Sequence, residues 1–157
     1  MTQSQLTWII ENIQYIETIN RHIPFNIEYH SVHEDYSFLV RVKKCFVYSE
    51  LDAFLLLNER LEYYIQEWTE DEFLVNDQRM TTTMLFLIPT WKEMNVASIT
   101  WKDFADQILE YPTSKEFAFF YEDKQHSVCT LIDRWNWIEA FGESDEEYFH
   151  FLWYTTA

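Results

Sequence analysis

The chain has 157 residues, of which 48% are hydrophobic and 19% aromatic, and its 27 acidic and 11 basic residues give a formal net charge of −16. This length suits one domain with a core of its own, and the aromatic content excludes a disordered acidic tail. The negative surplus disfavours direct binding of nucleic acid, and no apolar run approaches the roughly 20 residues of a membrane-spanning helix.

The first part of the chain predicts a helix followed by a β-hairpin. Apolar residues at three-to-four spacing predict a helix over residues 5–20. Residues 24–32 and 36–46 then alternate between apolar and polar side chains, which is typical of strands with one buried face. Pairing Ile27 with Val40 brings the apolar side chains of both strands to a common face, whereas a shift by one residue would separate them.

The middle of the chain predicts two further helices and a strand. Ser49 is expected to cap a long helix over about 50–68, with acidic residues in its first turn. A strand is expected over residues 80–88. Thr100, followed three positions later by an acid, resembles a capping box at the start of a short helix that ends before Tyr111.

The last part of the chain predicts mainly strands. Residues 116–122 and 126–132 are expected to form a second hairpin of central strands, because both faces are apolar. Residues 133–141 are open to a short helix ended by a left-handed Gly142, and residues 149–154 favour a strand over a helix. We therefore predict one α+β domain over residues 1–157, with a largely antiparallel sheet and two to four helices packed on it.

The scarcity of glycine excludes several enzyme classes. The chain has one glycine, where average usage would give roughly 11. Phosphate-binding loops, dinucleotide fingerprints and nucleophile elbows all depend on glycine, so nucleotide-dependent chemistry of the common kinds is excluded and no cofactor is expected. Cys45 and Cys129 lack the spacing of a metal site and are expected to be free thiols, with a disulfide as the alternative.

Two small polar groups could carry a site. His30 and His33, with the acids that follow, form the densest set of metal-ligand types, but a strand end followed by a turn would point the two imidazoles apart, so no bound metal is expected. The basic residues Arg41, Lys43 and Lys44 could bind an anion, but we favour cross-strand charge balance with acids such as Glu28.

Two acidic stretches stand out, one after the long helix and one before the C-terminal aromatic segment. Solvation is the simplest explanation for each, but a charge of −16 exceeds the roughly 2–8 charges that keep a small domain soluble. Tyrosine and tryptophan, both abundant here, are enriched at interface hot spots. We predict these partner-binding residues: Glu67, Trp68, Glu70, Asp71, Glu72, Asp77, Glu143, Asp145, Glu146, Glu147 and Trp153.

The sequence thus predicts a non-enzymatic acidic protein that inhibits a basic partner, such as a nuclease or another nucleic-acid-binding protein, by occluding its cationic surface. In size, charge and aromatic content the chain resembles immunity proteins that block nuclease toxins and phage proteins that block a defence nuclease. The alternatives are a DNA mimic, a small metal-dependent hydrolase using His30 and His33, and a structural subunit of an oligomer. A cytoplasmic location is expected, because the N-terminus lacks the basic residues of a signal peptide.

Overall fold

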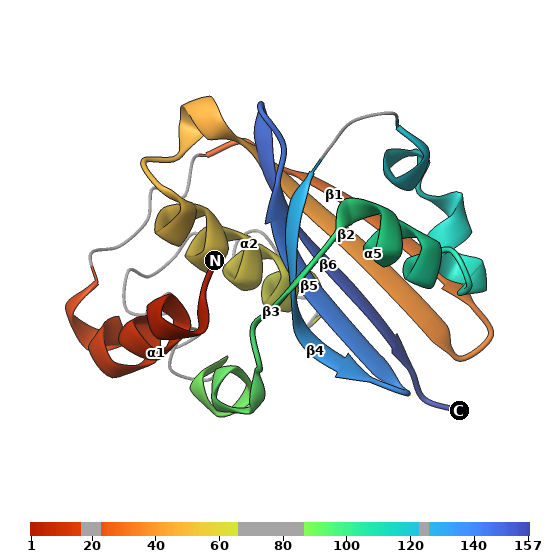
Figure 1. The fold of residues 1–157 in the computed structure, drawn as a ribbon, viewed down its shortest axis with the longest axis horizontal. Coiled ribbons are helices and arrows are strands. Elements are labelled where there is room, and N and C mark those ends of the chain that lie inside the picture. The colour runs from red at the N-terminus through yellow and green to blue at the C-terminus, as the bar shows by residue number, and fades with distance from the viewer. Residues whose placement is uncertain (17–22, 66–86, 123–125) are drawn as a thin grey trace.

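A computed structural model of the chain describes residues 1–16, 23–65, 87–122 and 126–157. In these residues a six-stranded antiparallel sheet with the order β1-β2-β6-β5-β4-β3 forms the centre of an α+β domain (Figure 1). The hairpin β1-β2 joins the meander β4-β5-β6 through pairing of β2 with β6. The strands are β1 (Asn26–Val32), β2 (Asp35–Lys43), β3 (Ala97–Ile99), β4 (Ser127–Arg134), β5 (Trp137–Glu143) and β6 (Glu147–Thr155).

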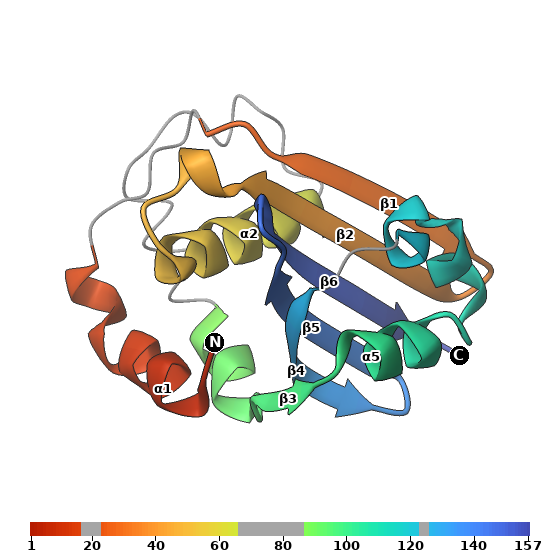
Figure 2. The same ribbon diagram turned by 45° about the horizontal axis from the view of Figure 1, so that its top comes forward.

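Helices cover both faces of this sheet (Figure 2). One face carries α1 (Gln3–Asn12), α2 (Glu50–Ile65) and a short helix at 87–93. The other carries α5 (Trp101–Ile108) and two 3₁₀ turns, Pro112–Glu116 and Ala118–Tyr121. Because successive side chains of a strand point to opposite faces, each inner strand contributes to two separate hydrophobic clusters.

The predicted β1-β2 hairpin and its register are confirmed. Ile27 pairs with Val40, and the other pairs follow the same register. Phe25 and Tyr29 remain 39% exposed, because β1 is an edge strand that a neighbour covers on one side only. His33 occupies the turn with a φ of 56°, a left-handed conformation that the short connection requires.

The three predicted helices are confirmed in their described parts. α1 is followed by a 3₁₀ turn at Ile13–Tyr15, so regular α-helix ends earlier than predicted. The Ser49 hydroxyl accepts a hydrogen bond from the Asp52 backbone N–H at 3.1 Å and begins α2. At α5 the Thr100 hydroxyl accepts from the Asp103 N–H at 3.1 Å and donates to the Asp103 carboxylate at 2.6 Å. Both starts thus satisfy a backbone donor that the helix itself leaves open.

The predicted hairpin between residues 116–122 and 126–132 is wrong. Residues 118–121 form a 3₁₀ turn, and β4 pairs instead with β3 and β5. Phe117, Phe119 and Phe120 are buried because their rings pack on the face of the sheet that carries α5. Their ring centroids lie 5.0–6.1 Å from those of Phe149 or Phe151. A short, continuous apolar run carries no hydrophobic period that separates a strand from a 3₁₀ turn.

The structure also settles the C-terminal part of the chain. The helix left open for residues 133–141 is wrong, because β5 is a strand paired on both sides, whereas the strand favoured for residues 149–154 is confirmed. The Ser144 hydroxyl accepts hydrogen bonds from the backbone N–H groups of Glu146 and Glu147 in the β5-β6 turn. Of the strand predicted over 80–88, residues 87 and 88 are helical and the rest lie outside the described residues.

Gly142 serves a different purpose from the predicted helix cap. Its φ is not positive, so no left-handed conformation calls for glycine. A Cβ at this position would lie 2.4 Å from Phe149 Cζ and 2.5 Å from the Ser127 carbonyl oxygen. Glycine is required because two strands and a buried ring approach its backbone closely.

Gly142→Ala is therefore expected to lower the free energy of unfolding by about 1–3 kcal/mol, as overpacking of a rigid core does. Chemical denaturation monitored by tryptophan fluorescence measures the loss. Adding Phe149→Leu should restore part of it, because the ring contact is relieved and the contact with the Ser127 carbonyl is not. An alanine variant as stable as the parent would show that this close approach does not exist in solution.

Candidate functional site

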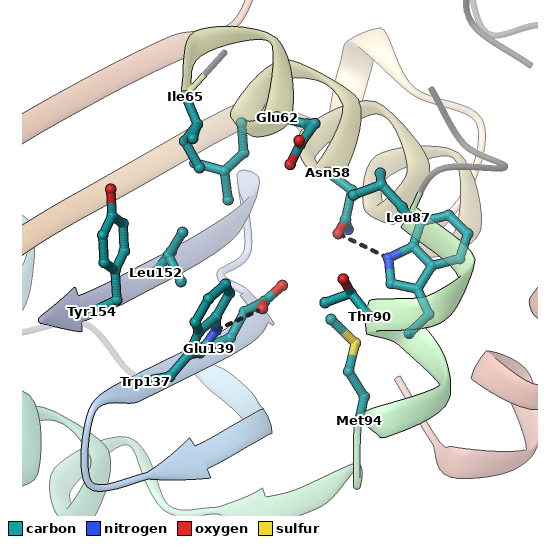
Figure 3. Close-up of a pocket in the computed structure, with 12 residues that line it drawn as sticks. Asn58, Glu62, Ile65, Leu87, Thr90, Met94, Trp137, Glu139, Leu152 and Tyr154 are labelled. Atoms are coloured by element: carbon teal, nitrogen blue, oxygen red, sulfur yellow. Dashed lines mark hydrogen bonds between the residues drawn. The ribbon is translucent and has the colours of Figure 1, made fainter. Parts of the chain in front are cut away.

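A pocket of about 320 Å³ opens between α2, the short helix at 87–93 and the strands β5 and β6 (Figure 3). Its walls are mainly apolar and aromatic, and four polar side chains converge on it. This combination is typical of a ligand site. The lining residues are Asn58, Leu61, Glu62, Ile65, Leu87, Thr90, Trp91, Met94, Trp137, Glu139, Leu152 and Tyr154.

Secondary structure places these side chains together. The four α2 residues that line the pocket are three or four positions apart and share one helix face. Trp137 and Glu139 of β5 are two apart and so point to the same face of the sheet. They pair across the strands with Tyr154 and Leu152 of β6, which complete the floor.

Glu139 is the polar centre of this floor, with 4% of its surface exposed. Its Oε1 accepts a hydrogen bond from His150 Nε2 at 2.8 Å, and its Oε2 accepts one from Trp137 Nε1 at 3.2 Å (Figure 3). Two accepted bonds, one on each oxygen, match an ionised carboxylate, which can only accept.

Hydrogen bonding also assigns the protonation state of His150, which is fully buried. The Trp91 indole N–H can only donate a hydrogen bond. The atom of the Asn58 amide that lies 3.2 Å from it is therefore the oxygen, and the amide nitrogen lies on the other side. The Asn58 nitrogen then donates to the Phe54 carbonyl at 2.8 Å and to His150 Nδ1 at 3.3 Å. His150 is therefore a neutral imidazole with its proton on Nε2, and it donates that proton to Glu139.

The sequence analysis missed this network. It connects residues from α2, the helix at 87–93, β5 and β6, so no local spacing reveals it. The available signal was the position of Glu139 and His150, each a polar residue inside an otherwise apolar run. A polar side chain in a buried strand needs a hydrogen-bond partner, but only the register of β5 against β6 shows that Glu139 and His150 are close enough to pair.

Aromatic rings border the mouth of the pocket. Tyr154 stacks on Tyr36 with ring centroids 5.0 Å apart, and Trp137 lies 5.9 Å from Tyr154. Burial raises the pKa of Tyr154, with a smaller contribution from neighbouring tyrosines. The Tyr154 hydroxyl is therefore neutral at physiological pH, and the rings present uncharged π faces.

The structure describes only one of the two predicted acidic stretches. Glu67, Trp68, Glu70, Asp71, Glu72 and Asp77 lie outside the described residues. The second stretch forms the β5-β6 turn, where Asp145 and Glu146 are exposed. Glu143 and Glu147 instead form ion pairs within the fold, with Lys44 at 2.6 Å and Arg41 at 3.2 Å.

Trp153, the remaining predicted contact residue, is 3% exposed. Its ring stacks on Tyr111 at 3.9 Å within the cluster under α5. This position gives Trp153 a packing role and leaves it almost no surface for a partner. Exposed tryptophans lie elsewhere, at Trp8 and Trp135, which are 50% and 77% exposed.

Two of the three basic residues, Arg41 of β2 and Lys44 just after it, balance charge within the fold as predicted. The Arg41 guanidinium contacts Glu28 at 2.6 Å as well as Glu147. A hydrogen bond from Lys44 to Glu143 raises the pKa of that lysine, which stays charged. The acidic surplus is thus partly neutralised by Arg41 and Lys44, whereas Asp145 and Glu146 at the tip of the β5-β6 turn are exposed to solvent.

The residues proposed for metal binding are not grouped around a common point. The His30 ring packs edge-on against Phe117 with centroids 4.6 Å apart, and His33 lies in the turn. Within the described residues, no three or more His, Cys, Asp or Glu side chains are placed to hold a metal ion. Cys45 is an exposed free thiol and Cys129 a buried one.

Among the described residues, no helix is long and apolar enough to cross a bilayer. Compared with known proteins, the chain matches no family model, no curated protein and no solved structure, so its function is argued from its own residues.

Proposed function

We propose that the protein is a non-enzymatic acidic binding protein that inhibits a basic partner, such as a nuclease, by covering its cationic surface. The observation that carries this proposal is the distribution of charge. The net charge is −16, and the Arg41 and Lys44 cations are held by acids of the same fold. A partner approaching the β5-β6 turn therefore meets the exposed carboxylates of Asp145 and Glu146.

Electrostatic steering gives this arrangement its effect. A surplus of one sign raises the rate at which an oppositely charged partner reaches the correct orientation, by orders of magnitude at low salt. Exposed rings such as Trp135, at the tip of the β4-β5 turn, could then supply short-range binding energy. A protein with this function needs no cofactor and no catalytic residues.

Reversing the charge of the turn tests the proposal. The partner is captured from extracts of the native cell at low and at high salt, and its association with purified variants is measured by surface plasmon resonance. Asp145→Lys with Glu146→Lys should slow association at least ten-fold at low salt, and the difference should shrink as salt screens the charges. Dissociation should change little, because rim charges act mainly on encounter.

A matched control separates local from total charge. Asp106→Lys with Glu110→Lys makes the same change in net charge at exposed positions in and just after α5. It should slow association less than the turn variant does. The reversal of Glu70, Asp71 and Glu72 tests the other acidic stretch in the same assay. If every variant associates as fast as the parent at low salt, the acidity only keeps the protein soluble.

A further inference from the structure

Within the described residues, the buried carboxylate of Glu139 in the pocket beside α2 contacts two hydrogen-bond donors and no lysine or arginine. Glu139 accepts hydrogen bonds from the neutral imidazole of His150 and from the indole of Trp137, which carries no charge. Taking a carboxylate out of water is costly unless a cation or a complete set of hydrogen bonds replaces the water. Each Glu139 oxygen accepts one bond and keeps a further lone pair, so the floor of the pocket still has acceptor capacity.

The surroundings of this carboxylate favour a flat organic cation. Trp137 and Tyr154 offer π faces at the mouth, where cations bind favourably. The Glu62 carboxylate and the Thr90 hydroxyl lie on the opposite side of the same space (Figure 3). A guanidinium group is planar, donates to two carboxylate oxygens at once and stacks on aromatic rings. An ammonium group is tetrahedral, so it neither stacks as a plane nor donates to a carboxylate in that two-pronged geometry.

We infer that this pocket binds a guanidinium group, supplied by an arginine side chain of the basic partner. The inference rests on the proposed function for the source of the arginine, but the site itself depends only on the pocket. The volume of about 320 Å³ is at the lower end for ligand pockets and suits one long side chain. Long-range charge would thus bring the partner in, and one buried cation would hold it in place.

Titration with a small arginine probe tests the site directly. N-acetyl-arginine amide is added to the ¹⁵N-labelled protein, and the indole N–H signals of Trp91 and Trp137 are followed by NMR. We expect saturable shifts of both signals. N-acetyl-citrulline amide, which has nearly the same shape without the charge, should bind at least ten-fold more weakly. Equal shifts with the two probes, or no saturable shift, would overturn the inference.

Variants of the pocket acids identify the group responsible. Glu139→Gln keeps the volume and removes the charge, so it should weaken binding of the arginine probe at least ten-fold. The new amide NH₂ group must face one of the two donors, His150 or Trp137, so the melting temperature of the variant is measured as well. Glu62→Gln, at the rim, should weaken binding several-fold. Asp106→Asn removes an exposed acid of α5, on the other face of the sheet, and should leave probe binding unchanged.

Competition then identifies the source of the guanidinium. If the arginine is the partner's, N-acetyl-arginine amide should displace the captured partner, and Glu139→Gln should speed partner dissociation at least ten-fold. Probe binding without competition would overturn the assignment to a partner side chain and indicate a free guanidino compound. Salt-dependent capture of a basic partner without binding of the arginine probe would overturn the inference that the pocket binds a guanidinium group. The proposed function would still stand.

Discussion

His150→Ala is expected to lower the free energy of unfolding by about 3–5 kcal/mol. The imidazole is fully buried and bridges two groups, Asn58 and Glu139. Its removal leaves the Asn58 N–H without an acceptor and Glu139 Oε1 without a donor, each costing about 1–3 kcal/mol, and it opens a cavity besides. Urea denaturation followed by tryptophan fluorescence measures the total.

A double-mutant cycle shows whether the network or the volume matters. Glu139→Leu and His150→Leu each leave one partner buried without its hydrogen bond, whereas the double variant removes both. The double variant should therefore lose less stability than the sum of the single variants, by about 0.5–3 kcal/mol. Losses that simply add would show that the two side chains do not interact in the folded protein.

Phe104→Ala is expected to cost about 3–5 kcal/mol, as truncation of a buried aromatic does. Phe104 is fully buried on α5, and its ring lies 5.9–6.1 Å from the rings of Trp101, Phe120 and Phe151. It thereby holds α5 and the neighbouring 3₁₀ turn on the sheet. Thermal unfolding followed by circular dichroism provides the measurement.

The neighbouring Tyr121→Ala provides the control for this prediction. Tyr121 belongs to the same 3₁₀ turn but is 61% exposed, so its loss should change stability by no more than about 0.5 kcal/mol. A Phe104 variant that is as stable as the Tyr121 variant would mean that the aromatic layer over this face contributes little to folding.

Local sequence patterns predicted the parts of the fold that have one solvent-exposed face and one buried face. The β1-β2 register follows from the alternation around Ile27 and Val40, and α2 follows from its apolar stripe and the Ser49 cap. Prediction failed where both sides are buried. Apart from exposed Ala118, residues 117–120 and 138–141 are buried and only Glu139 among them is polar, so no period distinguishes a strand from a 3₁₀ turn or a helix.

The candidate site was less predictable than the fold, for a related reason. The composition predicted acidic contact residues, and two of them, Asp145 and Glu146, are exposed as a contact would require. Glu143 and Glu147 instead form ion pairs with Lys44 and Arg41, which lie far away in the sequence. The Glu139–His150 pair depends on strand register, and register between β5 and β6 is set by the turn at Ser144 rather than by either residue.

The pairing of β2 with β6 has a consequence for how the protein acquires its structure. The two strands join distant parts of the chain: Arg41 and Glu147, which form an ion pair across them, are 106 positions apart. Closing so long a loop costs entropy before any contact repays it, which makes such sheets slow to assemble. Until β6 arrives, the β1-β2 hairpin exposes the unpaired edge of β2 and its apolar face. An edge of that kind is prone to pair with other chains, so pairing of β6 with β2 removes one aggregation-prone edge during folding.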